Sequence, residues 1–497
     1  MLTLLTIFFP ILSGIILYFR NLKQGSSPHR PYAICMAITD VLAVLAIFFA
    51  KPFVLFSVYP HVSFAFSLDT VGRWFMAAVV IAYTLALSYT FVYMRIEERD
   101  STFFCFYFVS MGALLAVCMS ANLVTAYFAF EITTLSTVPL VLHEQTQAAV
   151  AAGLKYLFYS IAGALMGLLG VFYCYQYAGE SASFTAGGFL DAAKLAGHEP
   201  VLLVISFITI IGFGTKAGMY PMHGWLPTAH PIAPAPASAL LSGIIAKSGV
   251  LMILRYVYFC VGTEHLRGTW VQYAWLSLTL LTIFMGSMMA FREKILKKRL
   301  AYSTVSQISY ALLGLALMTQ EGLEGSLLQV MQHAASKSCL FLCAGAFIYY
   351  YGIRRVDELR GIGLKMPIVL WCFTIAAMSL VGIPPLGGFT SKWHLAQAAL
   401  GSGLGGFSIA APVLLLISAL LTAGYLFPIM INGFFPGEEH HAVDVEGHIE
   451  IDVDDDEHPL HEEASRMMWI PLIGFCIVSL LVGLFGNSLI SLFGGIV

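Results

Sequence analysis

Five charged residues lie inside stretches that are otherwise long and apolar. They are Glu131 in ANLVTAYFAFEITTLSTVPLV, Lys216 in IIGFGTKAGMYPMHGWLP, Lys247 in SALLSGIIAKSGVLMILR, Lys337 in MQHAASKSCLFLCAGAF and Lys392 in GGFTSKWHL. An ionised side chain at the centre of a bilayer costs at least about 2.5–3.5 kcal/mol, so such a residue is a functional candidate by default. The sequence therefore predicts ion chemistry inside a membrane.

Lysine suits a proton relay because its pKa responds strongly to its surroundings. One glutamate cannot neutralise four lysines, so some of the lysines must lie in hydrated cavities or have a shifted pKa. His333 titrates near neutrality and lies four residues before Lys337, on the same side of a helix. Two structural alternatives stay open. Lys337 and Lys392 could extend to the headgroups from a helix end, and Glu131 could pair with one lysine only to hold helices together.

Glycines and prolines interrupt the helices beside two of these lysines. Lys216 is flanked by Gly212, Gly214, Gly218 and Pro221, and Lys392 follows Pro384, Pro385, Gly387 and Gly388. Interrupted segments in the two halves of a transporter are the best sequence pointer to its ion path, because the opened backbone can bind water or ions. The pattern predicts two discontinuous helices, each beside a buried lysine.

Other polar residues in apolar surroundings give weaker signals. His223, His230 and Lys155 are secondary candidates; Lys155, near His143 and Glu144, is either an entrance from the cytoplasm or an ordinary interfacial anchor. Asp40 has no evident partner, and Arg255 is expected to extend to the headgroups from a helix end.

The composition excludes a soluble chain. Only 11% of the 497 residues are charged and 59% are apolar, whereas a soluble domain is usually about 25% charged. The apolar runs suffice for about 14 spanning helices. The first run reads as a retained helix rather than a signal peptide. The net charge of −3 gives no sign of nucleic-acid binding, and the cysteines form no metal or haem motif, so we expect no cofactor in this chain.

The loops predict how the chain lies in the membrane. Alternate loops carry the basic clusters, which the positive-inside rule places in the cytoplasm, with both termini outside. The basic clusters are Arg20/Lys23/Arg30, Arg95/Arg99, Lys294/Lys297/Lys298/Arg299 and Arg354/Arg355/Arg360/Lys365. The segment from Glu438 to Glu463 is acidic and rich in histidine. Its alternation between Val443 and Val453 predicts a small β-hairpin in a solvated loop rather than a metal site.

These motifs resemble one family. The stretch from Gly212 to Arg255 is similar to the signature of the antiporter-like membrane subunits of respiratory complex I, of Mrp-type sodium/proton antiporters and of membrane-bound hydrogenases. Further similarities lie in Asn122 to Glu131, Lys298 to Gln307, the His333/Lys337 pair and GIPPLGGFTSK, which ends at Lys392. The segments HPIAP, from His230, and LTAGYLFPIMINGFF look more like the Mrp and hydrogenase branch, whereas Thr228 departs from the acidic residue of many relatives.

The resemblance implies an all-α membrane protein of about 14 transmembrane helices, with two inverted five-helix repeats and discontinuous helices. The implied parts are three N-terminal helices (1–102), a first repeat (103–260), a second repeat (270–433), the acidic loop (434–466) and a last helix (467–497). It also implies roles. Glu131 and Lys216 resemble the interacting acid–lysine pair, Lys247 the central lysine, His333 and Lys337 the link to the outer half-channel, and Lys392 the terminal lysine.

The expected function is proton, or sodium-coupled proton, translocation as the ion-pumping subunit of a redox-driven oxidoreductase complex in a prokaryotic inner membrane. The chain itself would catalyse no electron transfer. Its expected partners are lipid, other antiporter-like or small hydrophobic membrane subunits and, in a redox complex, peripheral subunits that bear cofactors. The main alternative is a subunit of a non-redox sodium/proton antiporter. A structural scaffold with an inactive ion path and a substrate transporter are further alternatives.

Overall fold

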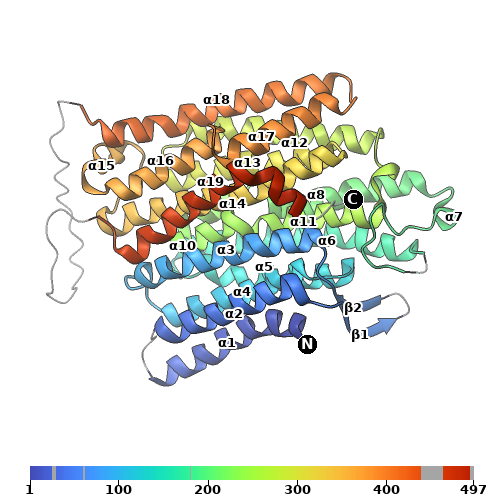
Figure 1. The fold of residues 1–497 in the computed structure, drawn as a ribbon, viewed down its shortest axis with the longest axis horizontal. Coiled ribbons are helices and arrows are strands. Elements are labelled where there is room, and N and C mark those ends of the chain that lie inside the picture. Colours follow the sequence, from blue (N-terminus) through green and yellow to red (C-terminus); the bar gives the residue numbers. More distant parts are fainter. Residues whose placement is uncertain (25–28, 60–61, 180, 438–462, 493–497) are drawn as a thin grey trace.

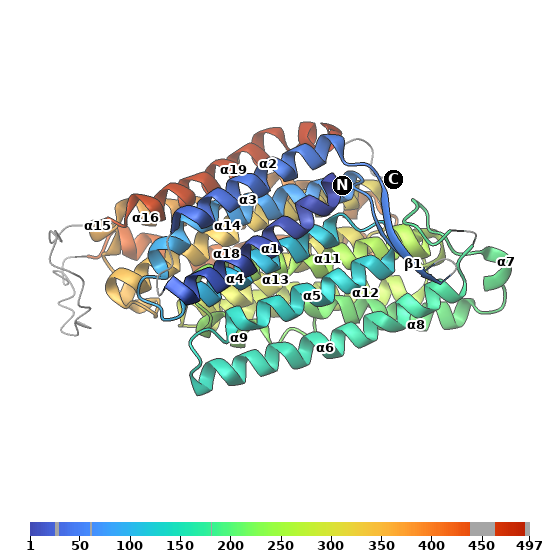
Figure 2. The ribbon, with the colours of Figure 1, turned by 90° about the horizontal axis from the view of Figure 1, so that it is seen from below.

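The computed structural model describes residues 1–497 except 25–28, 60–61, 180, 438–462 and 493–497. The helices run roughly side by side in one elongated bundle (Figure 1), and α6 and α8 lie along one long edge of it (Figure 2). The helices are α1 (Leu2–Gln24), α2 (His29–Phe49), α3 (Thr70–Tyr93), α4 (Asp100–Cys118), α5 (Leu123–Val141), α6 (Gln147–Gln176), α7 (Ala192–Leu195), α8 (Glu199–Ala217), α9 (Leu226–Ile232), α10 (Ala235–Leu240), α11 (Lys247–Leu254), α12 (Trp270–Arg292), α13 (Leu296–Ala316), α14 (Gln320–Tyr351), α15 (Ile362–Lys365), α16 (Pro367–Val381), α17 (Gly387–Gly401), α18 (Gly406–Phe434) and α19 (Arg466–Leu492).

Among the described residues, eleven helical stretches are long and apolar enough to cross a membrane, and α16 is a shorter apolar helix. The stretch Ala235–Val261 is wholly buried in its most apolar window, whereas α6 is buried over 39% of its window. A helix that is apolar on all sides and also buried belongs at the centre of a membrane bundle. The chain is a multi-pass membrane protein; the number of about 14 spans and the repeat boundaries stay predictions.

Both predicted helix breaks are present. Gly218 ends α8 with a φ of 75°, and Gly382 ends α16 with a φ of 98°, a backbone conformation that glycine adopts without strain. The chain resumes as α9 and α17. The central stretch is also irregular, because π-helical segments η1 (Leu241–Ile245) and η2 (Arg255–Val261) flank α11. These interruptions leave backbone carbonyls without partners in the usual helical ladder.

The helical membrane fold class is confirmed, and a small two-stranded sheet adds to it. Strands β1 (Phe53–Tyr59) and β2 (Val62–Phe66) pair antiparallel, with Phe53 opposite Phe66. Their β-branched and aromatic residues favour strands, and the segment is too short to span a bilayer. In Figure 1 this sheet lies at the same end of the bundle as α7, and α15 lies at the opposite end. The β-hairpin predicted between Val443 and Val453 falls outside the described residues.

We call the end of the bundle that holds α15 the basic-loop end. Several predicted basic loops meet there. The backbone N–H of Leu296, at the start of α13, donates to the carbonyl of Arg354, which follows α14. The residues Glu97, after α3, and Glu144, between α5 and α6, both interact electrostatically with Lys297. Loops from distant parts of the sequence therefore form one surface at this end.

Candidate functional site

Lys216 is buried in the core near the C-terminus of α8, with 2% of its surface exposed. Its ammonium group donates hydrogen bonds to the hydroxyl of Thr134 (3.0 Å) and to that of Tyr156, whose ring centroid lies 4.6 Å away. Neutral oxygens and an aromatic face thus replace the water lost on burial. α5 supplies Thr134, and α6 supplies Tyr156.

Glu131 lies on α5, one turn before Thr134. It is half-buried, and its Oε1 atom is buried and has no hydrogen-bond partner among the residues that the structure describes. The charges of Glu131 and Lys216 are close enough to interact electrostatically, but no ion pair of 4 Å or less joins them in the described part of the chain. The two predicted partners are therefore neighbours in one site, with hydroxyl groups as the direct contacts of the lysine.

Lys247 begins α11 directly after the π-helical segment η1. Its ammonium group donates to the carbonyl oxygen of Ser242, which lies in that segment. The hydroxyl of Ser242 in turn pairs with that of Thr304 on α13, at 2.7 Å. Only 1% of Lys247 is exposed. In η1 the backbone N–H of Ala246 donates to the carbonyl of Leu241, so the carbonyl of Ser242 loses its α-helical partner and accepts from the central lysine.

Lys337 is fully buried on α14, with 0% exposure. Its Nζ atom donates to the carbonyl oxygen of Leu300 (3.0 Å), and the hydroxyl of Thr304 donates to the same oxygen (2.9 Å). Hydrogen-bonding groups therefore link Lys247, through Ser242 and Thr304, to Lys337. His333 lies within electrostatic range of both lysines, and neither of its ring nitrogens has a partner among the described residues.

Lys392 lies on α17 beside the second helix break, and it is half-buried. Its ammonium group donates to the carbonyl oxygens of Leu380 and Val381 (2.9 Å for Val381) at the end of α16. It also lies 5.1 Å from the ring centroid of Tyr310. The break exposes the carbonyls that the lysine binds. Lys392 therefore bonds to the end of α16 and does not extend from a helix end to the lipid headgroups.

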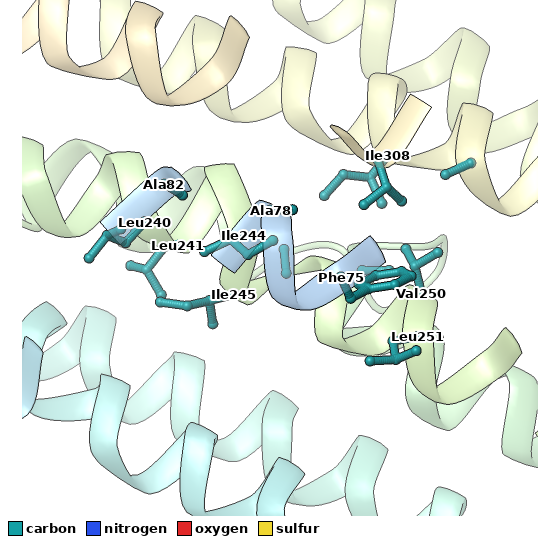
Figure 3. Close-up of a cluster of buried hydrophobic side chains, with 14 of the residues drawn as sticks. Phe75, Ala78, Ala82, Leu240, Leu241, Ile244, Ile245, Val250, Leu251 and Ile308 are labelled. Carbon is teal, nitrogen blue, oxygen red and sulfur yellow. The ribbon is translucent and has the colours of Figure 1, made fainter. Parts of the chain in front are cut away.

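Close backbone contacts bring the lysine-bearing segments together. A Cβ atom at Gly249 on α11 would lie 3.0 Å from the Cβ of Lys216, and one at Gly243 on η1 would lie 2.1 Å from the Oγ of Ser338 on α14. Glycine permits this approach because it has no side chain. The segment with Lys247 therefore contacts both the segment with Lys216 and the segment with Lys337. Figure 3 shows apolar side chains of this region, among them Ile244 and Leu251, near Phe75 of α3.

A glutamine chain joins the neighbours of Lys337 and Lys392. On α14, Gln332 Nε2 donates to Gln329 Oε1 (3.1 Å), and Ser336 donates to Gln332 (3.2 Å). Ser391, which precedes Lys392, donates to Gln329 (2.8 Å). These residues were not among those predicted from the sequence. The signal that could have revealed them is a pair of glutamines three residues apart in the apolar stretch LLQVMQH.

Of the secondary candidates, Lys155 and His223 are neighbours, and His230 lies deeper in the bundle. Lys155 is exposed on α6, and its Nζ atom donates to the hydroxyl of Thr228 (2.9 Å). His223 is half-buried, stacks on Tyr220 and interacts electrostatically with Lys155. His230 is fully buried, and its ring stacks on that of Phe341 on α14.

The surroundings of two further residues, Arg255 and Asp40, differ from those predicted. Arg255 does not extend to headgroups: only 1% of its side chain is exposed, and its guanidinium forms an ion pair with Asp69, which caps α3. Packing against Phe184 and Phe259 holds the guanidinium inside. Asp40 does have a partner, since the hydroxyl of Thr84 donates to its Oδ1 atom at 2.8 Å. In both cases the partner comes from a distant helix end or a neighbouring helix.

Comparison with known proteins identifies the family. Residues 120–421 match the family described as NADH:quinone oxidoreductase/Mrp antiporter, TM, and that range is more than half of the chain. The chain belongs to this family. The resemblance inferred from the sequence motifs is thereby confirmed.

Individual relatives come from more than one branch of the family. NADH-quinone oxidoreductase subunit N of Desulforudis audaxviator is 32% identical over 82% of this chain and 79% of its own length. One of the Na(+)/H(+) antiporter subunits of Alkalihalophilus pseudofirmus is 30% identical over 72% of this chain and 70% of its own length. A chain of the Mrp complex from Dietzia sp. DQ12-45-1b has the same fold, with a TM-score of 0.81 at 23% identity over 99% of this chain and 96% of that one.

Proposed function

We propose that this chain conducts protons across the membrane as a subunit of a redox-driven multi-subunit complex. The observation that carries the proposal is the environment of four lysines: Lys216, Lys247, Lys337 and Lys392. In the described residues, each ammonium group contacts hydroxyls or backbone carbonyls, and none contacts a carboxylate within 4 Å. Such lysines can lose a proton without leaving a buried carboxylate unpaired.

The proposed path begins at the Glu131/Lys216 site. A charge change there alters the field at Lys247, because the two lysine segments contact each other at Gly249. The proton then passes by Lys247 to the His333/Lys337 site and, along the glutamine chain, to Lys392. A like charge nearby favours proton release and an opposite charge favours retention, so each step biases the next. These site assignments are the core of the proposal.

The proposal extends to the setting of the chain. By the positive-inside rule, the basic-loop end would face the cytoplasm of a prokaryotic cell, and both termini would lie outside the inner membrane. The segments 103–260 and 270–433 are the proposed inverted repeats. The chain would hold no cofactor. Membrane partners would be further antiporter-like or small hydrophobic subunits, and peripheral subunits bearing cofactors would supply the driving reaction.

A second candidate is a subunit of a non-redox sodium/proton antiporter. The similarity to the antiporter protein from Alkalihalophilus pseudofirmus favours it. Mass spectrometry of the purified native complex separates the two candidates. Subunits with flavin, iron–sulfur or nickel sites support the redox complex, whereas small hydrophobic partners without such sites support the antiporter.

The Lys216→Ala variant tests the ion path. We expect the complex to assemble but proton translocation in liposomes to fall by at least about tenfold, which corresponds to about 1.4 kcal/mol of barrier. The matched control is Lys51→Ala, at an exposed lysine between α2 and β1. Translocation by the assembled Lys216→Ala complex at the rate of the control would overturn the proposed path.

A further inference from the structure

Lys297 belongs to a basic cluster that the sequence predicts to lie in the cytoplasm, yet its side chain is buried. Only 6% of its surface is exposed, at the start of α13. Its Nζ atom donates to the carbonyl oxygens of Ala233 and Pro231 (3.3 Å for Pro231). Pro231 lies in the last turn of α9, and Ala233 lies in the break between α9 and α10. Lys297 therefore occupies a third interruption of the helices.

Two carboxylates lie on the outer side of Lys297, at the basic-loop end. Glu97 is half-buried after α3, and Glu144 is exposed in the turn between α5 and α6. Both interact electrostatically with Lys297, as does Arg354, but neither forms an ion pair with it within 4 Å among the described residues. Burial, together with Glu144, raises the pKa of Glu97, and Lys297 opposes this shift. Glu97 therefore takes up protons at a higher pH than an ordinary glutamate.

His230 lies on the inner side of Lys297. It is 0% exposed, and neither of its ring nitrogens has a hydrogen-bond partner in the described part of the chain. Its ring stacks on Phe341, with 4.8 Å between the centroids. The charged groups that act on it are Lys297, Lys337 and Lys247. Burying an imidazole without hydrogen bonds costs folding free energy. A role in proton transfer between Lys297 and the two central lysines would explain why the histidine is buried there.

We propose that Lys297 is the gate residue through which protons reach the central lysines from the mouth formed by Glu97 and Glu144. This inference rests on the proposed function and adds its cytoplasmic entrance. A carboxyl group of the mouth gives its proton to the neutral Lys297 amine, which leaves a carboxylate and an ammonium group. The ammonium group then gives the proton to a ring nitrogen of His230, which becomes an imidazolium and passes a proton to Lys247 or Lys337.

If the role of Lys297 is purely structural, substitutions at this position should have different effects. If Lys297 only holds the break between α9 and α10 together, any side chain that donates to the two carbonyls will serve. Arginine donates hydrogen bonds but stays protonated in proteins, so it can hold the break and cannot relay a proton. Lys297→Arg thus separates the two roles, and Lys297→Met removes both the donor and the proton while keeping much of the length.

The experiment measures the initial rate of proton uptake at the basic-loop end of the assembled complex in oriented liposomes. For Lys297→Met and Lys297→Arg we expect the rate to fall by at least about tenfold, as for the loss of a proton-transfer group. The control is Lys298→Met, because the adjacent Lys298 is 35% exposed and forms a surface ion pair with Glu293 at 2.8 Å. An unchanged rate in Lys297→Arg would overturn the gate and leave a structural role.

A second variant tests the proposed proton entrance if the Lys297 variants do not assemble. The double variant Glu97→Gln/Glu144→Gln removes both carboxylates of the mouth but keeps their shape and polarity. We expect a several-fold slower uptake, and an unchanged rate would overturn the proposal. The Lys216→Ala variant, measured in parallel, reports on the proposed function itself. If Lys216→Ala stops translocation while all variants at the mouth and at Lys297 keep full rate, only the gate is refuted.

Discussion

At the scale of single residues, the buried lysines show how an ammonium group can be held in an apolar core without an ion pair. Lys216 binds two hydroxyls. Lys247 and Lys392 bind backbone carbonyls at irregular or interrupted helical segments, and Lys337 binds a backbone carbonyl within α13. Hydrogen bonds to a charged donor contribute about 1.5–3 kcal/mol each, which offsets part of the cost of removing the charge from water. An opposite charge in direct contact would hold the proton more firmly.

Glu131→Gln tests the coupling between Glu131 and Lys216. The glutamate carries the opposite charge within electrostatic range of Lys216, so its neutralisation removes the bias on the lysine. We expect translocation to fall nearly as far as in Lys216→Ala, and the double variant to be little worse than either single variant, as for coupled residues. Rates measured in liposomes for the two singles and the double give the coupling. Effects that simply add would show that the two residues act independently.

At the scale of elements, the ion pair between Arg255 and Asp69 fastens the N-terminus of α3 to the segment η2. The Asp69 carboxylate also accepts a hydrogen bond from the backbone N–H of Gly72 (2.8 Å), which caps α3. Burial opposes the charge of Asp69, but the guanidinium of Arg255 and the cap together hold its pKa below the usual value. The charged pair therefore stabilises the contact between two elements that are distant in sequence.

Asp69→Asn should destabilise the protein, because it keeps an acceptor for the cap but leaves the buried charge of Arg255 uncompensated. We expect a loss of about 3 kcal/mol, the low end for a broken buried pair, since the side chain of Asp69 is 39% exposed. Because the pKa of Asp69 is lowered on folding, this stabilisation is present above about pH 4 and is lost as the pH falls through the folded pKa. Thermal unfolding in detergent as a function of pH measures both effects.

The matched control is Asp191→Asn, the same change at the cap of the short exposed helix α7. We expect it to shift the unfolding temperature little. If Asp69→Asn and Asp191→Asn behave alike, then the Arg255 ion pair contributes no more than an ordinary helix cap.

The second helix break depends on the absence of a side chain at Gly388. A Cβ atom there would lie 1.6 Å from the carbonyl oxygen of Ser379, so α16 and α17 must separate to admit it. We expect Gly388→Ala to cost about 1–3 kcal/mol of stability, as for an overpacked core, and to slow translocation by moving the carbonyls that Lys392 binds. Thermal unfolding and proton transport by the assembled complex measure the two effects.

Gly401→Ala is the control for that experiment, because a Cβ atom at Gly401 on the same helix would meet no atom of the described residues within 4 Å. Alanine at this site should leave both stability and transport unchanged or slightly improve stability. Equal behaviour of the two variants would refute the claim that close packing at Gly388 sets the geometry of the break.

At the scale of the whole molecule, Glu463 connects a part of the chain that is remote in sequence to the start of α16. The carboxylate of Glu463 accepts hydrogen bonds from the backbone N–H groups of Ile368 and Ala464. The first of these bonds serves the N-terminus of α16, where backbone N–H groups lack helical partners. Glu463 is thus a helix cap as well as the end of an acidic stretch.

Replacing residues 438–462 by a glycine–serine linker of equal length, with Glu463 kept, should leave proton translocation unchanged. The segment lies outside the predicted ion path, and the cap on α16 is preserved. Transport by the assembled complex is the measurement. A second replacement that also changes Glu463 to alanine should lower thermal stability by about 1 kcal/mol, as for a lost helix cap. Loss of transport in the first variant would make the segment part of the mechanism.

The membrane class and both helix breaks could be predicted from the sequence because they depend on local composition. A charge within about 20 apolar residues is costly wherever those residues pack, and glycine and proline interrupt a helix through their own backbone chemistry. For this reason Lys216 and Lys392 were correctly predicted to lie beside breaks. The short strands β1 and β2 were missed because a span of five to seven residues carries little periodic signal.

Only the tertiary structure decided which groups touch. Arg255 and Asp69 are 186 residues apart in the chain, and Lys216 binds hydroxyls from α5 and α6 instead of contacting Glu131 directly. Lys297 looks like any basic loop residue in the sequence, yet it is buried and donates hydrogen bonds to the carbonyl oxygens of Pro231 and Ala233. Contacts of this kind depend on how distant helices pack, and a chain's local pattern specifies which faces are apolar but not which neighbours they meet.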